Sequence, residues 1–113
     1  MTLCEIIATV QGTLVSRSAN LHTEVAHICA ADLMSDVLAF AAPGSVLLTG
    51  LCNPQVVRTA EMADIVGIIF VRGKTPPPET IALAEERDIP LVTTPYSMFE
   101  MCGRLYQVES ERR

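Results

Sequence analysis

Two segments of the chain repeat one pattern at an interval of 24 residues, and this repeat constrains the fold more than any other feature. The matching positions are Pro54, Val57, Ala60, Glu61, Asp64 and Ile65, then Pro78, Ile81, Ala84, Glu85, Asp88 and Ile89. Proline is favoured at the first position of a helix, and each Asp-Ile pair leads into the next apolar strand. The repeat is explained if two helices pack on one sheet with the same apolar register. It predicts two consecutive βα units, hence parallel strands and right-handed crossovers.

The rest of the chain supplies the other elements of such a fold. Helical spacing and cap residues predict helices over residues 3–11, from Asp32 or Ser35 to 41, over 54–64, from 75–78 onward, and from Tyr96 or Ser97 to 108. Apolar runs predict strands over 13–16, 24–30, 45–49, 65–71 and 89–93. The two early strands could pair as a hairpin or lie apart in one sheet. Gly12 stands where a left-handed residue would end the first helix. The predicted fold is α/β, a three-layer α/β/α arrangement with a mostly parallel sheet.

Length and charge limit the class of protein. The 113 residues suit one domain, which we place at residues 1–108, with a polar tail over 109–113 that is expected to fray. The net charge of −5 argues against a nucleic-acid partner, because phosphates require clustered Lys and Arg. No apolar run approaches the ~20 residues that a bilayer requires, and the first residues lack a basic signal region, so we expect a cytoplasmic protein without a membrane partner. The four cysteines lack metal-site spacing, and we expect free thiols, with no metal and no cofactor.

Chemistry is expected where the parallel strands end, since ligands of open parallel sheets bind beyond the carboxyl ends of the strands. Each strand end there leads to a helix N-terminus, where free N–H groups and the helix dipole favour an anion. The candidate ligand-binding residues are Ser35, Asp36, Thr49, Gly50, Asn53, Arg72, Gly73, Lys74, Thr94 and Tyr96. Such residues are also ordinary in βα turns, so a pocket for a small anionic ligand stands beside a purely structural explanation.

Catalytic motifs are absent or incomplete in the sequence. The stretch from Gly67 to Thr75 resembles a phosphate-binding loop, but five residues instead of four separate its glycines, and Gly67 lies inside a predicted strand. There is no G-x-S-x-G elbow, and no catalytic residue is predicted. Cys52 precedes a helix N-terminus, a position that lowers the pKa of a thiol, and is the candidate reactive thiol.

Several segments, taken in order, resemble the DRTGG domain: residues 31–38, 47–50, 84–92 and 94–99. The resemblance implies a fold like the N-terminal domain of the bacterial HPr serine kinase/phosphorylase and a regulatory or ligand-sensing role without catalytic activity. In that family the domain occurs alone, beside CBS pairs or within phosphotransacetylases. This chain has Gly50-Leu51-Cys52 where the family often has Gly-Asp-Arg, and Val71-Arg72-Gly73 where it has Thr-Gly-Gly. A ligand role of the Asp-Arg pair therefore does not carry over, and replacement of its charge by Arg72 is a hypothesis.

Three functional hypotheses remain. The first is a non-enzymatic regulatory module that binds a small anion, such as a nucleotide, at the carboxyl edge of the sheet. The second is an interaction module without a ligand, which the apolar Leu51-Cys52 pair favours and which would dock on a larger enzyme or on itself. The third, an enzyme centred on Cys52, is the weakest. Because a short, half-apolar chain tends to leave an apolar patch exposed, we expect a homo-oligomer, by default a dimer.

Overall fold

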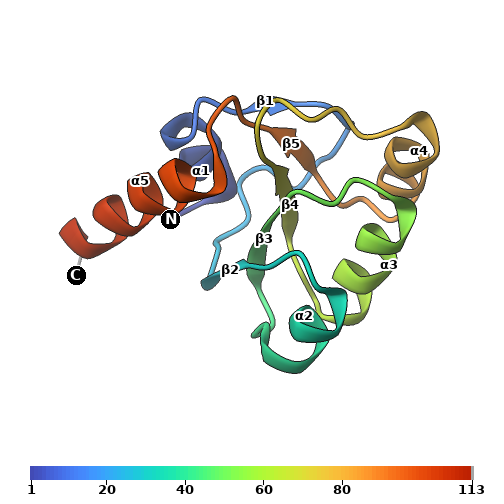
Figure 1. Ribbon diagram of the computed structural model, residues 1–113, viewed down its shortest axis with the longest axis horizontal. Helices are drawn as coiled ribbons and strands as arrows, with labels where there is room; N and C mark the ends of the chain where they lie inside the picture. Colours follow the sequence, from blue (N-terminus) through green and yellow to red (C-terminus); the bar gives the residue numbers. More distant parts are fainter. Residues whose placement is uncertain (113) are drawn as a thin grey trace.

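The computed structural model describes residues 1–112 and contains one five-stranded sheet with helices on both faces (Figure 1). The helices are α1 (Leu3–Thr9), α2 (Met34–Phe40), α3 (Pro54–Met62), α4 (Pro78–Glu86) and α5 (Met98–Glu111), and the strands are β1 (Thr13–Leu14), β2 (His27–Ala30), β3 (Ser45–Thr49), β4 (Gly67–Phe70) and β5 (Leu91–Thr93). The strand order is β1-β5-β4-β3-β2, and every neighbouring pair is parallel except β1 with β5. The predicted α/β fold with a mostly parallel sheet is confirmed.

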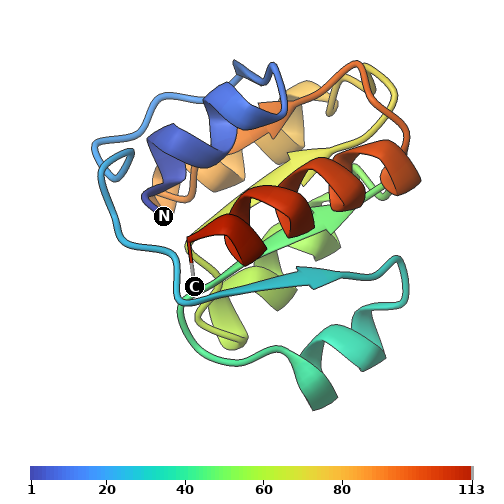
Figure 2. The ribbon, with the colours of Figure 1, turned by 90° about the vertical axis from the view of Figure 1, so that its left-hand side faces the viewer.

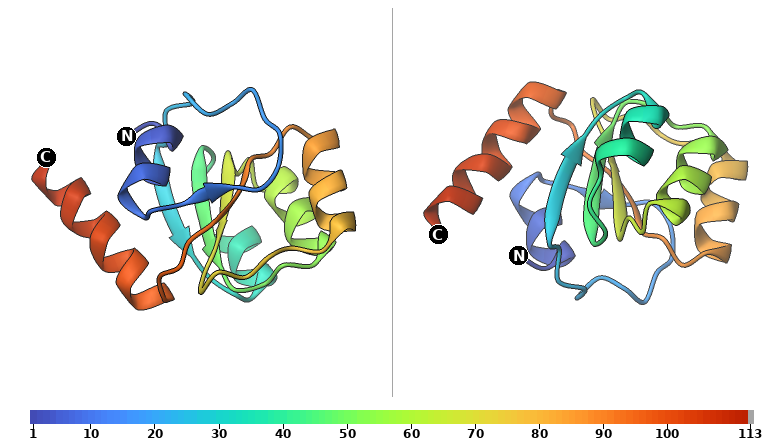
Figure 3. Two further views of the ribbon diagram at one scale, coloured as in Figure 1. Left: turned by 90° about the horizontal axis from the view of Figure 1, so that it is seen from above. Right: turned by 90° about the horizontal axis from the view of Figure 1, so that it is seen from below.

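The sheet separates two apolar cores. Helices α2, α3 and α4 cover one face, and α1 and α5 cover the other, as the two views of Figure 3 show. On the α5 side the core contains Ile69 and Val92 beneath Met101, and on the opposite side it contains Ile68 and Phe70 beneath α3 and α4. Strands β3 and β4 are buried along their whole length, which explains their unbroken apolar sequence.

The repeated Asp-Ile pair has a backbone explanation. Asp64 and Asp88 follow α3 and α4 with left-handed φ angles of 55° and 54°. The amides of Ile65 and Ile89 then donate to the carbonyls of Ala60 and Ala84, each at 2.9 Å. This is the Schellman ending of a helix, in which a left-handed residue lets the chain turn back into a strand. The repeat therefore reflects two helix ends with the same backbone geometry as well as a shared apolar register.

The first helix ends differently from the prediction. A capping box fixes its start: Thr2 accepts from the Glu5 amide, and the Glu5 carboxylate accepts from the Thr2 amide. The left-handed residue after α1 is Gln11, with φ 51°, and not Gly12. Gly12 is required instead for close packing, because a Cβ at that position would lie 2.6 Å from Cγ1 of Val92.

The two early strands lie apart, at opposite edges of the sheet, so the hairpin alternative is wrong. Both are shorter than predicted, since β1 keeps only Thr13–Leu14 and β2 only His27–Ala30. Neither Asp32 nor Ser35 starts the next helix, whose N-cap is Leu33, without a side-chain cap bond.

The last helix continues past the predicted end at residue 108. Helix α5 runs to Glu111, and Arg112 donates to Oε2 of Glu5 at 2.6 Å. Together with the Thr2 amide, whose hydrogen bond is the larger cause, this contact lowers the pKa of Glu5 to about 2. The polar tail thus continues α5 to Glu111, and its Arg112 contacts a carboxylate of α1; fraying of the tail stays a prediction.

Candidate functional site

The carboxyl ends of four parallel strands meet at one edge of the sheet, as predicted, and an acidic residue joins two of them. Asp32, which follows β2, accepts from Oγ1 of Thr49 at 3.0 Å and from the amide of Gly50 at 2.8 Å. These bonds fix the end of β2 to the loop after β3. Sequence reasoning placed Asp32 only at a helix start, because hydrogen bonds over 18 residues leave no local signal.

Gly50 lies between a cation and an anion. Its carbonyl accepts from Nζ of Lys74 at 2.9 Å. A Cβ on Gly50 would lie 3.5 Å from that nitrogen and 3.6 Å from Oδ1 of Asp32. Thr49, Gly50 and Lys74 are thus brought together as predicted, with Asp32 as an additional member. The ammonium of Lys74 is held in place by a backbone carbonyl and not by a carboxylate.

The loop after β4 is a tight turn that binds the loop after β5. Arg72 and Gly73 have φ angles of 57° and 67°, and the Lys74 amide donates to the Val71 carbonyl at 3.1 Å, which is the geometry of a type I′ turn. The amides of Arg72 and Gly73 donate to the carbonyls of residues 96 and 94, at 2.9 and 2.7 Å. These N–H groups are therefore used within the protein, while the side chain of Arg72 is exposed.

The loop after β5 has one structural and one accessible residue. Thr94 is fully buried, donates to the carbonyl of Val10 at 2.6 Å and accepts from the Tyr96 amide at 3.3 Å. Tyr96 is half-buried, and the guanidinium of Arg104 lies over its ring, 4.3 Å from the centroid. Sequence reasoning missed Arg104, although two helical turns of spacing from Tyr96 were a usable signal.

The helix N-termini at this edge offer fewer donors than expected. Helix α4 is preceded by Pro76 and Pro77 and begins at Pro78, and none of the three has an N–H group. Helix α3 begins after Asn53, whose side chain makes no cap bond and is exposed. Ser35 and Asp36 are exposed in the first turn of α2. Within residues 1–112 the side chains of Asn53, Ser35 and Asp36 make no hydrogen bond at this edge.

Three basic residues near the carboxyl edge form no ion pair among the described residues. Arg17, Arg87 and Arg112 pair with carboxylates at 3.3, 3.5 and 2.6 Å. Arg72, Lys74 and Arg104 have no carboxylate within 4.0 Å among the described residues. Arg104 lies over Tyr96, Lys74 donates to the carbonyl of Gly50 in the loop after β3, and Arg72 lies in the loop after β4.

The pKa of the Cys52 thiol is raised and not lowered as predicted. Burial is the larger cause, and the nearby ammonium of Lys74 acts weakly in the opposite direction. The carbonyl of Cys52 accepts from Oγ1 of Thr80 at 2.7 Å, which holds the residue against α4. The structure gives this cysteine no activating partner within residues 1–112.

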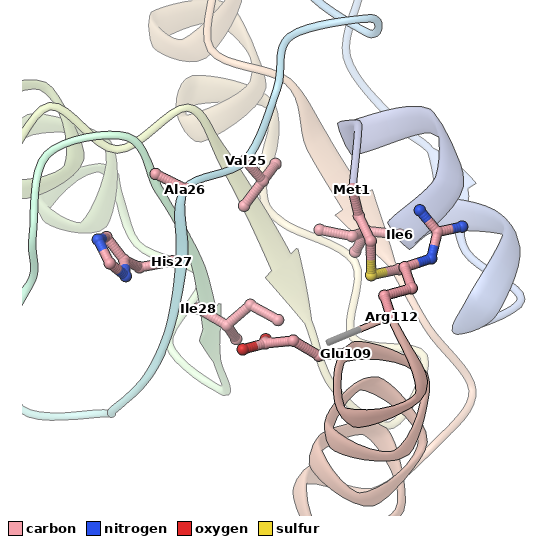
Figure 4. A pocket seen from close by; sticks show the side chains of 8 residues that line it. All are labelled: Met1, Ile6, Val25, Ala26, His27, Ile28, Glu109 and Arg112. Carbon is pink, nitrogen blue, oxygen red and sulfur yellow. The ribbon is translucent and has the colours of Figure 1, made fainter.

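The hollows that the structure describes lie away from this edge. Two, of about 240 and 340 Å³, lie along β2 where it faces α5, and Figure 4 shows the first. A third, of about 230 Å³, lies at the opposite end of the sheet beside Asp64 and Asp88. In the described part of the chain, no three His, Cys, Asp or Glu side chains are grouped for a metal ion, and no helix is long and apolar enough to cross a membrane.

Comparisons with known proteins agree with this fold. The model of the DRTGG domain family matches residues 5–108. A crystal structure of the CBS and DRTGG domains of the regulatory region of Clostridium perfringens pyrophosphatase, complexed with the activator diadenosine tetraphosphate, is similar with a TM-score of 0.66 and 19% identity. The similarity covers 89% of this chain and 44% of that one. None of the curated proteins matches the chain. Because the family model spans nearly the whole sequence, the chain belongs to the DRTGG domain family, whose domains are regulatory.

Proposed function

We propose that the chain is a regulatory module that binds a small phosphate-containing anion at the carboxyl edge of its sheet. The observation that carries the proposal is the group of Arg72, Lys74 and Arg104, which lack carboxylate partners in residues 1–112 although acids outnumber bases in the chain. An anion would supply the missing countercharge. Enzymatic chemistry forms no part of the proposal, since the family is regulatory.

The geometry supports a phosphate because guanidinium groups bind phosphate oxygens with two parallel hydrogen bonds. Arg72 holds a left-handed conformation outside a helix end, and such strain is concentrated at functional sites. The backbone amide of Arg72 donates to the Tyr96 carbonyl at 2.9 Å, which joins the turn that contains Arg72 to the residue whose ring Arg104 covers. The exposed side chains of Asn53 and Ser35 are further candidate hydrogen-bond donors to the anion, whereas the carboxylate of Asp36 would repel a phosphate.

The base of a nucleotide would have a stacking surface in Tyr96. Arg104 now covers that ring, and a phosphate could draw the guanidinium away while an aromatic base replaces it. The ligand in the pyrophosphatase structure, diadenosine tetraphosphate, combines adenine bases with phosphates. It is therefore the first probe for this chain, together with ATP and AMP.

Binding of these three nucleotides should be measured by thermal shift and by isothermal titration calorimetry. We expect Arg72→Ala and Arg104→Ala to weaken the binding of the best nucleotide by at least about tenfold each, because a hydrogen bond to a charged group contributes about 1.5–3 kcal/mol. Arg58→Ala is the matched control, since Arg58 is exposed on α3 and has no carboxylate partner among the described residues. Equal affinities in the wild type and all three variants would refute the site.

A further inference from the structure

The outer edge of β2 is an exposed strand without the usual protection. It is an end strand of the sheet, and Figure 2 shows it at the rim with no further strand beyond it, only helix α2 and the segment after it. Edge strands are normally shielded by charges, proline or very short length. The opposite edge strand, β1, has only two residues, whereas β2 has four, and residues 25–31 contain neither a charged residue nor a proline. The edge at β2 is therefore suited to pairing.

The helices beside β2 leave part of it uncovered. On the α5 side, a hollow of about 340 Å³ separates the strand from Leu105 and Tyr106 of α5. It continues toward α1 as the hollow in Figure 4, where Ile28 of β2 and Glu109 of α5 face each other. On the other side, α2 carries Leu33 and Phe40, which are 60% and 80% exposed. These two lie seven residues apart and therefore share one flank of the helix.

We propose that two copies of this chain pair through β2, antiparallel about a two-fold axis, into one continuous sheet of ten strands. A symmetric interface uses the same surface twice, so each copy supplies the strand that the edge of the other lacks. An axis perpendicular to the sheet places α2 beside α2 of the second copy on one face. On the other face the hollows of the two copies join into a trough above the paired strands, lined by Tyr106 from both.

The exposed aromatic side chains supply about half of the area that a small stable dimer buries. A buried aromatic side chain contributes about 150–250 Å². Phe40 is 80% and Tyr106 is 68% exposed, so the two together offer about 300 Å² in each copy by the same estimate. Two copies then bury about 600 Å² through these residues, half of the roughly 1,200 Å² of a small stable interface. Leu33, which is 60% exposed, and the paired backbone of β2 add to this area. An unrelated strand would pair with β2 but would leave Leu33 and Phe40 in water, which favours a second copy as the occupant.

The oligomeric state and the protection of β2 test this interface independently of any nucleotide. Light scattering of the wild type at rising micromolar concentration should show a dimer, and the amides of β2 should exchange more slowly in the dimer than at high dilution. Ala30→Lys places a charge in the strand, and Phe40→Lys places one on the flank of α2. Each should raise the dimer dissociation constant at least about tenfold, as expected for a central interface residue.

Met62→Lys is the matched control, because Met62 is 61% exposed on α3 and lies away from β2. It should leave the dimer unchanged. A monomeric wild type at every concentration overturns the proposal, and so does a dimer that both substitutions leave intact. If Ala30→Lys fails to fold, as judged by circular dichroism, Phe40→Lys and the exchange rates of β2 still decide the question.

Discussion

Asp64 and Asp88, the two aspartates of the repeat, form a matched pair. Substitutions at these positions can separate the effect of backbone strain on the free energy of unfolding from the effect of side-chain hydrogen bonds. Both adopt the same left-handed conformation at the end of a helix. The carboxylate of Asp88 accepts from Ser18 Oγ at 3.1 Å, from the Ala19 amide at 3.3 Å and from Asn20 Nδ2 at 2.8 Å. The carboxylate of Asp64 makes no such bond in residues 1–112. Replacing each by glycine relieves the same strain but removes hydrogen bonds at only one position.

The expected effects have opposite signs. A left-handed conformation costs an L residue about 1–2 kcal/mol, and glycine returns about 0.5–1 kcal/mol of this through the greater freedom of the unfolded chain. Asp64→Gly should therefore stabilise the protein by up to about 1 kcal/mol. Asp88→Gly gains the same amount but loses three exposed hydrogen bonds, each worth about 0.5–1 kcal/mol. It should be destabilised by about 1 kcal/mol overall.

Urea unfolding followed by circular dichroism measures this difference, and thermal unfolding provides a second reading. A gap of about 2 kcal/mol between the variants corresponds to roughly 8 °C in Tm for a domain of this size. Asp88→Asn, which keeps one acceptor oxygen and tolerates the left-handed conformation, should fall between the wild type and Asp88→Gly. Equal changes in Asp64→Gly and Asp88→Gly would refute the reasoning, because the loop over residues 16–20 would then contribute nothing through Asp88.

Three further predictions concern packing, a buried hydroxyl and pH. Gly12→Ala should destabilise the protein by about 1–3 kcal/mol, because its Cβ would lie 2.6 Å from Cγ1 of Val92. Gly103→Ala in α5 has open space around its Cβ and should stabilise the protein by about 0.5–1 kcal/mol. Urea unfolding of the two variants measures this difference. Thr59→Val should be neutral or stabilising in the same assay, since the buried Oγ1 of Thr59 has no partner among the described residues; a loss above about 1 kcal/mol would contradict this. The lowered pKa of Glu5 stabilises the fold above its ordinary value of 4.5, and this stabilisation should be lost as the pH falls toward about 2. Glu5→Gln should therefore show a smaller loss of unfolding free energy across that range, and an identical pH profile would contradict it.

Local signals predicted most of the fold because they are carried by neighbouring residues. Pro54 and Pro78 mark helix starts wherever the chain lies, since a proline lacks only an N–H that the first turn leaves unpaired. The apolar runs of β3 and β4 require burial on both faces. The placement of β1 and β2 at opposite edges could not be predicted in this way, because strand pairing joins residues far apart in the sequence.

In the candidate site, too, local signals could be predicted from the sequence and contacts between distant residues could not. Local sequence patterns are enough to predict that the segments containing Gly50, Lys74 and Tyr96 follow parallel strands, and such strands end at a common edge. The bond of Asp32 to Gly50 and the position of Arg104 over Tyr96 depend on the tertiary structure. A polar side chain bonds to whichever group the folded chain brings within about 3 Å, and its position in the sequence does not specify that group.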